Sequence, residues 1–377
     1  MRVSCLTIIV MGVNCAFASI PLFRHYPELE QNISHTALGD FPTPVEQCIR
    51  LSNHLGCTLL CKRDDQAGAV RDGSRLFGGN KVRKLEFLLA RALAIKATTV
   101  LTFGCAGSNH ALATTVYARQ LGLATRCLLA PQPNSWVVKR NLLLQMHYGA
   151  ELYTFTNAQE RITATEHHTR DVQLKTGSEP YTIPVGGSTP LGVLGFINAV
   201  FELEEQMKAA QENLPDFIYV PAGSMGTLVG LLIGLQLIKA STVVVAVAIG
   251  SGDVVSAARS LFERTRDFLT PYQASFLDLA WSKVNLIVAD SFYGNGYGHG
   301  TQEGQDATTL FFDNEAIVLD DTYTAKAAAA LIHDAHEGKI RTKKVLFWLT
   351  FFGDACKNMC DHVSYNDLPQ PFHTYFE

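Results

Sequence analysis

The sequence lacks the features that mark several classes of protein. Its 31 lysine and arginine residues nearly balance 35 aspartate and glutamate residues, which leaves a formal net charge of −4. Since no run of basic residues is present either, nothing favours binding to nucleic acid or to an acidic membrane surface. Outside the N-terminus, no stretch approaches the ~20 apolar residues that a membrane-spanning helix needs. These absences predict a globular protein that binds no nucleic acid and, apart from an N-terminal leader, no membrane.

Two familiar binding motifs are missing as well. The Cys356 and Cys360 pair has no second pair of cysteine or histidine residues at metal-ligand spacing, so no metal site is predicted. The glycine-rich segment 221–227 does not fit the G-x-G-x-x-G pattern, because Met225 interrupts the spacing, and it has no Gly-Lys-Ser or Gly-Lys-Thr ending. A dinucleotide site and a nucleotide-binding P-loop are therefore weakly supported.

The N-terminus has the features of a secretory signal peptide. Arg2 is followed by an apolar run, 6–13, and then by the small-x-small sequence Ala-Phe-Ala at 16–18. This pattern predicts a signal peptide over 1–18, with cleavage near Ala18 and export to the periplasm or out of the cell. The alternative is an apolar leader on a cytoplasmic protein.

Cleavage at that point would leave seven cysteines. The number is odd and several of them lie in apolar, strand-like runs, which favours buried free thiols over a framework of disulfides. The seven are Cys48, Cys57, Cys61, Cys105, Cys127, Cys356 and Cys360.

Short β patterns alternate with helical patterns along the chain. In the first series, strands are predicted at 98–103, 125–130 and 151–155, with helices at 109–121 and 136–148 between them. Strands joined in this way form a parallel sheet. A second series has predicted strands at 217–220, 242–249, 284–288, 316–319 and 344–349 and predicted helices at 227–238 and 324–336.

Two such series predict an α/β fold with two three-layer domains and a cleft between them. The segment 67–75 carries charge, glycine and little periodicity, so a loop is predicted there. The last residues, 357–377, are predicted to form an irregular tail.

One lysine stands where it could act as a nucleophile. Gly78, Gly79 and Asn80 precede Lys81 at the start of a predicted helix. The positive helix end and the nearby basic residues at 83–84 disfavour the ammonium form, and a neutral amine can form a Schiff base. Taken alone, the segment favours a solvated lysine on an amphipathic helix over a nucleophile.

Two further turns lie between a strand and a helix, where backbone N–H groups can face an anion. Ser108 in the turn 104–110 is a natural N-cap, and it could be only that. The turn 223–227 suits a single phosphate held by N–H and hydroxyl groups, or it could be a plain tight turn. Tyr297, among glycines, and Tyr323, at a helix start, are further candidates.

Together these segments resemble a known family. Residues 78–86 are similar to the lysine motif of the D-cysteine desulfhydrase and 1-aminocyclopropane-1-carboxylate (ACC) deaminase family, and the resemblance covers roughly 39–355. Further motifs agree in the same order; they lie at 62–65, 108–110, 184–192, 223–227, 296–298 and 323–326.

The resemblance implies the tryptophan-synthase-β fold, also called fold type II of the enzymes that use pyridoxal 5′-phosphate (PLP). It implies a large PLP-binding domain made of 20–92 and 188–377, and a small domain at 93–187, with the cofactor in the cleft. It also implies a small amino-acid substrate and a homodimer.

Roles toward the cofactor follow from the same resemblance. Lys81 would form a Schiff base with PLP and later move a proton at the substrate Cα. Asn109 would hydrogen-bond the phenolic oxygen of the cofactor, and Thr350 would face its pyridine nitrogen. The phosphate would be held by Gly223, Ser224, Met225, Gly226 and Thr227.

Roles toward the substrate are implied as well. Its carboxylate would be received at the helix start by Ser108, Asn109 and His110, and Thr324 would be a further substrate-binding residue. Tyr297 and Tyr323 would flank the reacting carbon as polar or acid–base partners. The predicted catalytic residues are thus Lys81, Ser108, Tyr297 and Tyr323.

Three positions favour one activity of the family over the other. Deaminases have Glu where this chain has Thr324, and usually Leu where it has Thr350, and His110 replaces Gln. A neutral hydroxyl at Thr350 would leave the pyridine unprotonated. β-Elimination tolerates this weaker electron sink, because the leaving group takes the charge. The predicted reaction is therefore α,β-elimination from a small D-amino acid, D-cysteine first, to pyruvate, ammonia and sulfide.

Two alternatives remain open. One is ring-opening deamination of ACC to 2-oxobutanoate, which Thr324 opposes. The other is a PLP-binding paralogue without turnover, because Phe351 and Phe352 follow Thr350 where the family usually has Gly-Gly.

Overall fold

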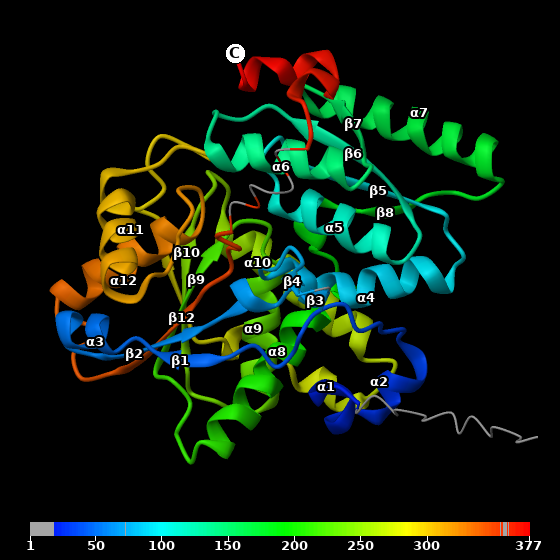
Figure 1. The fold of residues 1–377 in the computed structure, drawn as a ribbon. Helices are drawn as coiled ribbons and strands as arrows, with labels where there is room; N and C mark the ends of the chain where they lie inside the picture. The colour runs from blue at the N-terminus through cyan, green and yellow to red at the C-terminus, as the bar shows by residue number, and fades with distance from the viewer. Residues whose placement is uncertain (1–18, 72, 355, 357–359, 361) are drawn as a thin grey trace, which may run out of the picture.

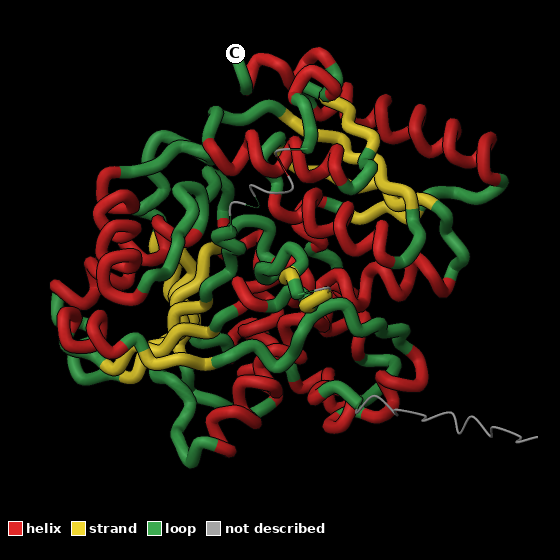
Figure 2. The backbone as a smooth tube through the Cα atoms, in the orientation of Figure 1, coloured by secondary structure: helices red, strands yellow, loops and turns green. Residues whose placement is uncertain are grey.

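The computed structural model describes residues 19–377 except 72, 355, 357–359 and 361, and the predicted signal peptide lies outside the described residues. The strands gather into two separate sheets with helices around each of them (Figures 1 and 2). A short two-stranded hairpin is formed in addition by β3 (Val70–Arg71) and β4 (Ser74–Arg75).

The larger sheet has six strands in the order β1-β2-β12-β9-β10-β11. All neighbours are parallel except β1 and β2, which are antiparallel. The strands are β1 (Val45–Gln47), β2 (Thr58–Lys62), β9 (Phe217–Ala222), β10 (Val243–Ala248), β11 (Leu286–Ala289) and β12 (Lys344–Trp348).

Helices cover both faces of this sheet because its strands are apolar on both sides. Val244 and Ala246 of β10 pack with one group of helices, and Val245 and Val247 pack with the other. Successive residues of a strand point to opposite faces, so a nearly all-apolar strand is what a doubly covered sheet requires. The first group is α8 (Pro190–Ala209), α9 (Gly226–Leu237) and α10 (Val254–Leu269); the second is α3 (Ile49–Leu55), α11 (Gln302–Glu315) and α12 (Thr324–His336).

The smaller sheet has four parallel strands in the order β7-β6-β5-β8. On one face Cys127 and Leu129 pack with α5 and α6, and on the other Leu128 packs beside α7. The elements are β5 (Thr99–Cys105), β6 (Ala124–Ala130), β7 (Glu151–Thr154), β8 (Tyr181–Ile183), α5 (Asn109–Gln120), α6 (Trp136–His147) and α7 (Ala158–Thr176).

Helix α4 (Lys81–Ala94) joins the two parts, since it packs against α8 of the larger and α5 of the smaller. The approach to α8 is close: a Cβ on Gly195 would lie 2.2 Å from the carbonyl oxygen of Arg83. At the N-terminus, α1 (Pro21–His25) and α2 (Pro27–Asn32) lie beside α8, where the backbone N–H of Leu22 donates to Asn198.

Most predicted elements are confirmed, and one is wrong. The helix predicted at 324–336 is α12 (Thr324–His336), but no strand forms at 316–319. Ile317 and Leu319 are buried in alternation, which is the strand period. This segment instead connects α11 to α12, starts at Ala316 with a φ of +54°, and forms no ladder with any described strand.

Two irregular segments also contain more structure than expected. The predicted loop at 67–75 includes the β3–β4 hairpin, and the tail includes 3₁₀ turns at Tyr365–Asp367 and Gln370–Tyr375. Leu368 and Phe372 of this tail pack against Cys127 of β6 and Val138 of α6. The end of the chain thus lies with the smaller sheet, although the sequence assigned it to the large domain, and the division at 93 and 187 stays a prediction.

The buried cysteines of the described residues are free thiols, as predicted. They are Cys48, Cys57, Cys61, Cys127 and Cys356. Groups of three or more residues placed to hold a metal ion are not found in the described part of the chain. Nor does any described helix have the length and apolar character needed to cross a membrane.

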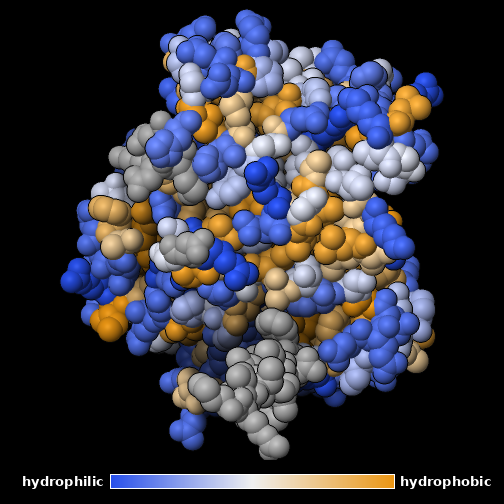
Figure 3. All heavy atoms as spheres, turned by 45° about the vertical axis from the view of Figure 1, so that its right-hand side comes forward, coloured by the Kyte–Doolittle hydropathy of each residue, from blue (hydrophilic) through white to orange (hydrophobic). Residues whose placement is uncertain are grey.

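Hydrophobic side chains reach the surface across the middle of the face drawn in Figure 3.

Candidate active site

A cavity of about 410 Å³ lies where the carboxyl ends of strands from both sheets meet. Parallel α/β sheets bind ligands at this edge, and the volume is in the range of small-molecule sites. Two predicted residues, Gly226 and Thr324, are outside the lining. The predicted residues within it are Lys81, Ser108, Asn109, His110, Gly223, Ser224, Met225, Thr227, Tyr297, Tyr323 and Thr350.

Lys81 is the first residue of α4, and its amine is enclosed by the protein although the residue as a whole keeps some surface toward the cavity. Burial lowers its pKa to about 8, while the negative charge of Asp320 acts in the opposite direction. The lowered pKa agrees with the expectation from the sequence, but its cause is burial and not the neighbouring basic residues. Arg83 is turned away toward Asp64 and Glu202.

A buried ion network fixes the helix that carries Lys81. Arg83 donates to Asp64 (Nε to Oδ2, 3.0 Å) and to Glu202 (Nη1 to Oε2, 2.9 Å). Lys62 donates to Glu202 at 2.6 Å, and the indole of Trp348 donates to Asp64 at 2.8 Å. Burial raises the pKa of Glu202, but Arg83 and Lys62 outweigh it and lower that pKa to about 2. The motif at 62–65 therefore anchors α4 to β2, α8 and β12.

The turn between β9 and α9 has the features of an anion cradle, and we use that name for it. The first helical N–H, of Gly226, donates to Ser188 Oγ at 3.1 Å, and Thr227 Oγ1 accepts from Asn80 at 2.9 Å. A Cβ on Gly226 would lie 2.6 Å from Ser188 Oγ and 2.7 Å from Lys84 Nζ. Glycine is therefore required for the close approach of these groups, even though Gly226 itself is not part of the lining.

Lys84 is a functional candidate that the sequence reasoning missed. It is buried, its Nζ donates to the carbonyl of Gly186 at 3.1 Å, and no carboxylate of the described residues forms an ion pair with it. Burial, and secondarily Lys81, lower its pKa well below the usual value. An anion in the cradle would supply its missing counterion. The sequence did contain a signal for it: Lys84 follows Lys81 by three positions on a helix, and residues three apart lie on the same face.

The start of α5 offers a second, different polar site. Ser108 Oγ accepts from the N–H of Ala111 at 3.1 Å, so it is the N-cap, while its proton stays available to donate. Asn109 Oδ1 accepts from Asn141 at 3.0 Å. His110 is buried with neither ring nitrogen partnered by a described residue. Burial, then Lys81 and Lys84, lower its pKa well below 6.5, so its ring is neutral.

The two candidate tyrosines form a pair. Their hydroxyls lie 2.6 Å apart and their rings meet edge to face. Burial raises the pKa of both, so both phenols stay protonated near neutral pH. The loop that carries Tyr297 is held by Lys326, whose Nζ donates to the carbonyls of Tyr293 (2.7 Å) and Gly296 (3.2 Å).

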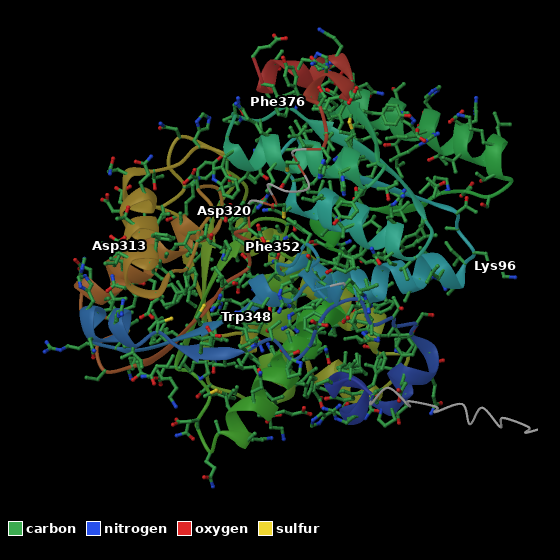
Figure 4. All side chains as sticks on the ribbon, in the orientation of Figure 1. Lys96, Asp313, Asp320, Trp348, Phe352 and Phe376 are labelled. Carbon is green, nitrogen blue, oxygen red and sulfur yellow. The ribbon has the colours of Figure 1, made fainter. Side chains whose placement is uncertain are left out.

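Asp320 is a second residue that the sequence reasoning missed, and it explains the position of Thr324. Asp320 lines the cavity near the middle of the molecule (Figure 4). Thr324 Oγ1 donates to Asp320 Oδ1 at 2.7 Å and accepts from its N–H at 2.8 Å, while the N–H of Tyr323 donates to Oδ2. Burial raises the pKa of Asp320, and these bonds oppose the rise. The hydroxyl of Thr324 thus holds Asp320 and does not reach the cavity, which differs from its predicted substrate contact.

These features fit pyridoxal phosphate. An enclosed lysine of lowered pKa suits its aldehyde, and the cradle with Lys84 suits its phosphate. The residues that would hold it are Lys81, Lys84, Asn109, Ser188, Thr227 and Thr350.

Sequence comparisons agree with this fit. The family described as pyridoxal-phosphate dependent enzyme matches residues 36–350. A Pyrococcus furiosus protein, named provisionally as an ACC deaminase, is 32% identical over 330 residues, covering 86% of this chain and 92% of that protein. A D-cysteine desulfhydrase from Klebsiella pneumoniae is 34% identical over 323 residues, covering 83% and 90%.

Solved structures agree with the fold. A homologue of ACC deaminase superposes with a TM-score of 0.74 at 30% identity, covering 89% of this chain and 98% of that one. A threonine deaminase from T.th. superposes with a TM-score of 0.56 at 20% identity, which shows the fold alone. The predicted two-part fold, family and cofactor are confirmed: the chain belongs to the family of pyridoxal-phosphate-dependent enzymes.

Proposed function

We propose that the chain is a carbon–sulfur lyase that acts by α,β-elimination on a small D-amino acid, with D-cysteine as the first substrate to test. The Cα–H and Cβ–S bonds break, and with one water the products are pyruvate, ammonia and hydrogen sulfide. The relatives do not decide this substrate by similarity, because both names occur at nearly equal identity.

The observation that carries the proposal is Thr350, a residue of the cavity lining whose side chain ends in a hydroxyl and not in an acid. Its carbonyl accepts a hydrogen bond from Asn80 N–H at 3.1 Å, which ties this part of the lining to the lysine motif. The carboxylate of the described lining, Asp320, already accepts bonds at both oxygens. A hydroxyl at the ring of the cofactor suits a reaction whose leaving group carries negative charge away. Expulsion of thiolate is such a reaction, whereas opening of a cyclopropane is not.

The chain's own residues divide the remaining work. Pyridoxal phosphate, when bound, withdraws electrons from the substrate Cα and so weakens its C–H bond. Lys81 takes the Cα proton, since its amine is enclosed and its pKa is about 8. The start of α5 and the hydroxyl of Ser108 orient the substrate carboxylate. Tyr297 and Tyr323 are both protonated and hydrogen-bonded to each other, which leaves one hydroxyl proton of the pair to donate to the departing sulfur.

A product assay tests the proposal. Purified holoenzyme is incubated with D-cysteine, L-cysteine and ACC, and pyruvate, sulfide and 2-oxobutanoate are measured. We expect pyruvate and sulfide in equal amounts from D-cysteine, less from the L-enantiomer, and little 2-oxobutanoate. Ready formation of 2-oxobutanoate without sulfide would overturn the proposal in favour of ACC deamination.

A paralogue without turnover is the second candidate, and Phe351 favours it because this ring lines the cavity. The same assay separates the two. A cofactor spectrum without product from any of the three substrates would support the paralogue.

We further propose that the protein is a homodimer and that it is exported after cleavage near Ala18. The family resemblance supports the first and the sequence at 1–18 supports the second. Light scattering on the purified protein tests the dimer. N-terminal sequencing of protein from its own cells should begin near Ser19, and intact Met1 in the cytoplasm would refute export.

A further inference from the structure

Arg140 on α6 is a buried cation with an unusual set of partners. It is 4% exposed, and no carboxylate of the described residues forms an ion pair with it. Its guanidinium carbon lies 5.5 Å from the ring centre of Phe77, 5.0 Å from that of Trp136 and 5.3 Å from that of Phe351. Aromatic faces attract cations most strongly where water is excluded.

The same guanidinium is bonded to the segment that follows β12. Nη1 of Arg140 donates to the carbonyl oxygens of Phe352 (3.0 Å) and Asp354 (2.7 Å). This segment begins at Thr350, which lines the cavity together with Phe351. Phe352 lies near the middle of the molecule, where the two parts adjoin (Figure 4).

On its other side Arg140 approaches a second part of the cavity lining, at Asn109. Its Nη2 lies 3.5 Å from Asn109 Oδ1, and its neighbour Asn141 donates to the same oxygen at 3.0 Å and to the carbonyl of Gly107 at 2.8 Å. The helix α6 packs on the smaller sheet, whereas the segment 350–354 continues from β12 of the larger sheet. One side chain thus connects two parts of the lining that come from different sheets.

We propose that Arg140 is a positioning residue that holds the segment 350–354 against the smaller sheet and so fixes the position of Thr350 relative to Asn109 in the lining of the cofactor cavity. Phe351 is then one of the three rings against which the guanidinium lies, together with Phe77 and Trp136. Two glycines at 351–352 would still offer carbonyl oxygens, but they would leave the cation without the ring of Phe351. Phe351 and Phe352, which replace the usual Gly-Gly and favoured a paralogue without turnover, would then serve to hold Arg140.

This role should be specific for arginine. A planar guanidinium can stack on rings while its separate N–H groups reach two carbonyls, whereas a lysine ammonium is a compact, strongly hydrated point charge. Arg140→Lys therefore keeps the charge but loses the geometry. The inference rests on the cofactor cavity and not on the identity of the substrate.

The test measures how firmly the holoenzyme holds its cofactor. Release of PLP after dilution is followed by the visible absorption, and hydrogen exchange is followed in peptides covering 350–354 and 107–110. We expect at least tenfold faster release in Arg140→Met and a smaller increase in Arg140→Lys, with faster exchange confined to those two peptides. Arg259→Met, at an exposed arginine of α10, is the matched control and should change neither quantity.

A double-mutant cycle with Phe351→Leu completes the test and remains readable should Arg140→Met fold poorly. If Arg140 acts through this ring, the effects of the two changes on release are less than additive. Release at the wild-type rate in both single variants would overturn the proposal. So would a rise in exchange spread over the whole protein, which would show only general destabilisation. Neither readout needs turnover, so a failure of the lyase proposal stays distinguishable.

Discussion

Two strand–turn–helix units, one from each sheet, line the same cavity. They differ in how the N-terminus of the helix is capped. At β5–α5 the chain closes the end itself, since Ser108 accepts from Ala111 N–H at 3.1 Å. At β9–α9 the N-cap is Met225, with a φ of +66° and no capping side chain. The N–H of Gly226 donates to Ser188 Oγ, but this end has no N-cap side chain, so we call it the open end; a bound anion can complete it.

The neighbouring charges differ in the same sense. Lys84, a buried lysine whose charged form a bound anion would stabilise, lies beside the open end of α9, whereas the neutral ring of His110 follows the closed end of α5. A phosphate, with up to two negative charges, fits the first end, and the single charge of a substrate carboxylate fits the second. A helix N-terminus without a capping side chain, next to a buried lysine without a carboxylate partner, is therefore the expected place for the phosphate of a resident cofactor.

Lys81 lines the same cavity as the two helix ends, and its loss should have the largest effect. Lys81→Ala should abolish turnover and the visible absorption of lysine-bound cofactor, because no other amine stands at that point of the cavity lining described here. The fold should be retained by circular dichroism. Borohydride reduction of the wild type should label Lys81, and a label on Lys84 or Lys326 instead would contradict the assignment.

The pH dependence of cofactor attachment should follow the lowered pKa of Lys81. The neutral amine is the reactive form, and with a pKa of about 8 its fraction falls roughly tenfold per pH unit below that point. Attachment of PLP to the apoenzyme should therefore accelerate up to about pH 8 and level off above it, as measured by stopped-flow absorbance. A rate still rising at about pH 10 would indicate an ordinary lysine.

Filling the open helix end should weaken cofactor binding. In Gly226→Asp the new side chain meets Ser188 and Lys84, and its charge occupies the place of the phosphate. PLP affinity should fall at least tenfold, or ~1.4 kcal/mol, by equilibrium titration. Gly252→Asp is the matched control, since a Cβ there meets no atom within 4 Å. Unchanged affinity in Gly226→Asp would place the phosphate elsewhere.

Removing the cap at the closed end should act on the substrate instead. Ser108→Ala should cost about 1 kcal/mol of stability and raise KM several-fold, while PLP affinity is retained. Ser135→Ala provides the control, because Ser135 caps α6 in the same way, accepting from Val138 N–H at 3.3 Å, and lies outside the cavity lining. Equal losses of stability and an unchanged KM in both variants would show that Ser108 only caps α5 and does not bind the substrate.

Local patterns predicted the elements around these helix ends well, because the patterns are set by burial along one strand or helix. The apolar run of β10 (Val243–Ala248) and the small-residue face of α12 (Thr324–His336) are examples. The strand predicted at 316–319 fails for the opposite reason: alternating burial does not supply a neighbouring strand to pair with.

The candidate site was predictable where one segment carries the motif, as at Lys81 or the turn 223–227. It was not predictable where the contact joins distant segments. Asp320 looks like a surface carboxylate in sequence, and only the fold brings it to the cavity with Thr324 on its oxygen. Arg140 likewise gains its role from residues more than 200 positions away, such as Phe352.

The smallest effect on activity is expected at Thr324, where sequence and structure disagree. Thr324→Val keeps the shape of the side chain but removes two hydrogen bonds to buried Asp320, at a cost of ~1–3 kcal/mol in unfolding free energy. Because Asp320 also accepts from Tyr323 N–H, kcat should fall a few-fold while KM stays constant. Thr309→Val, at an exposed hydroxyl bonded to the carbonyl of Gln305, is the control and should leave stability and both constants nearly unchanged. A raised KM with full stability in Thr324→Val would instead restore Thr324 to the substrate contact that its motif implies, and would make Asp320 a bystander.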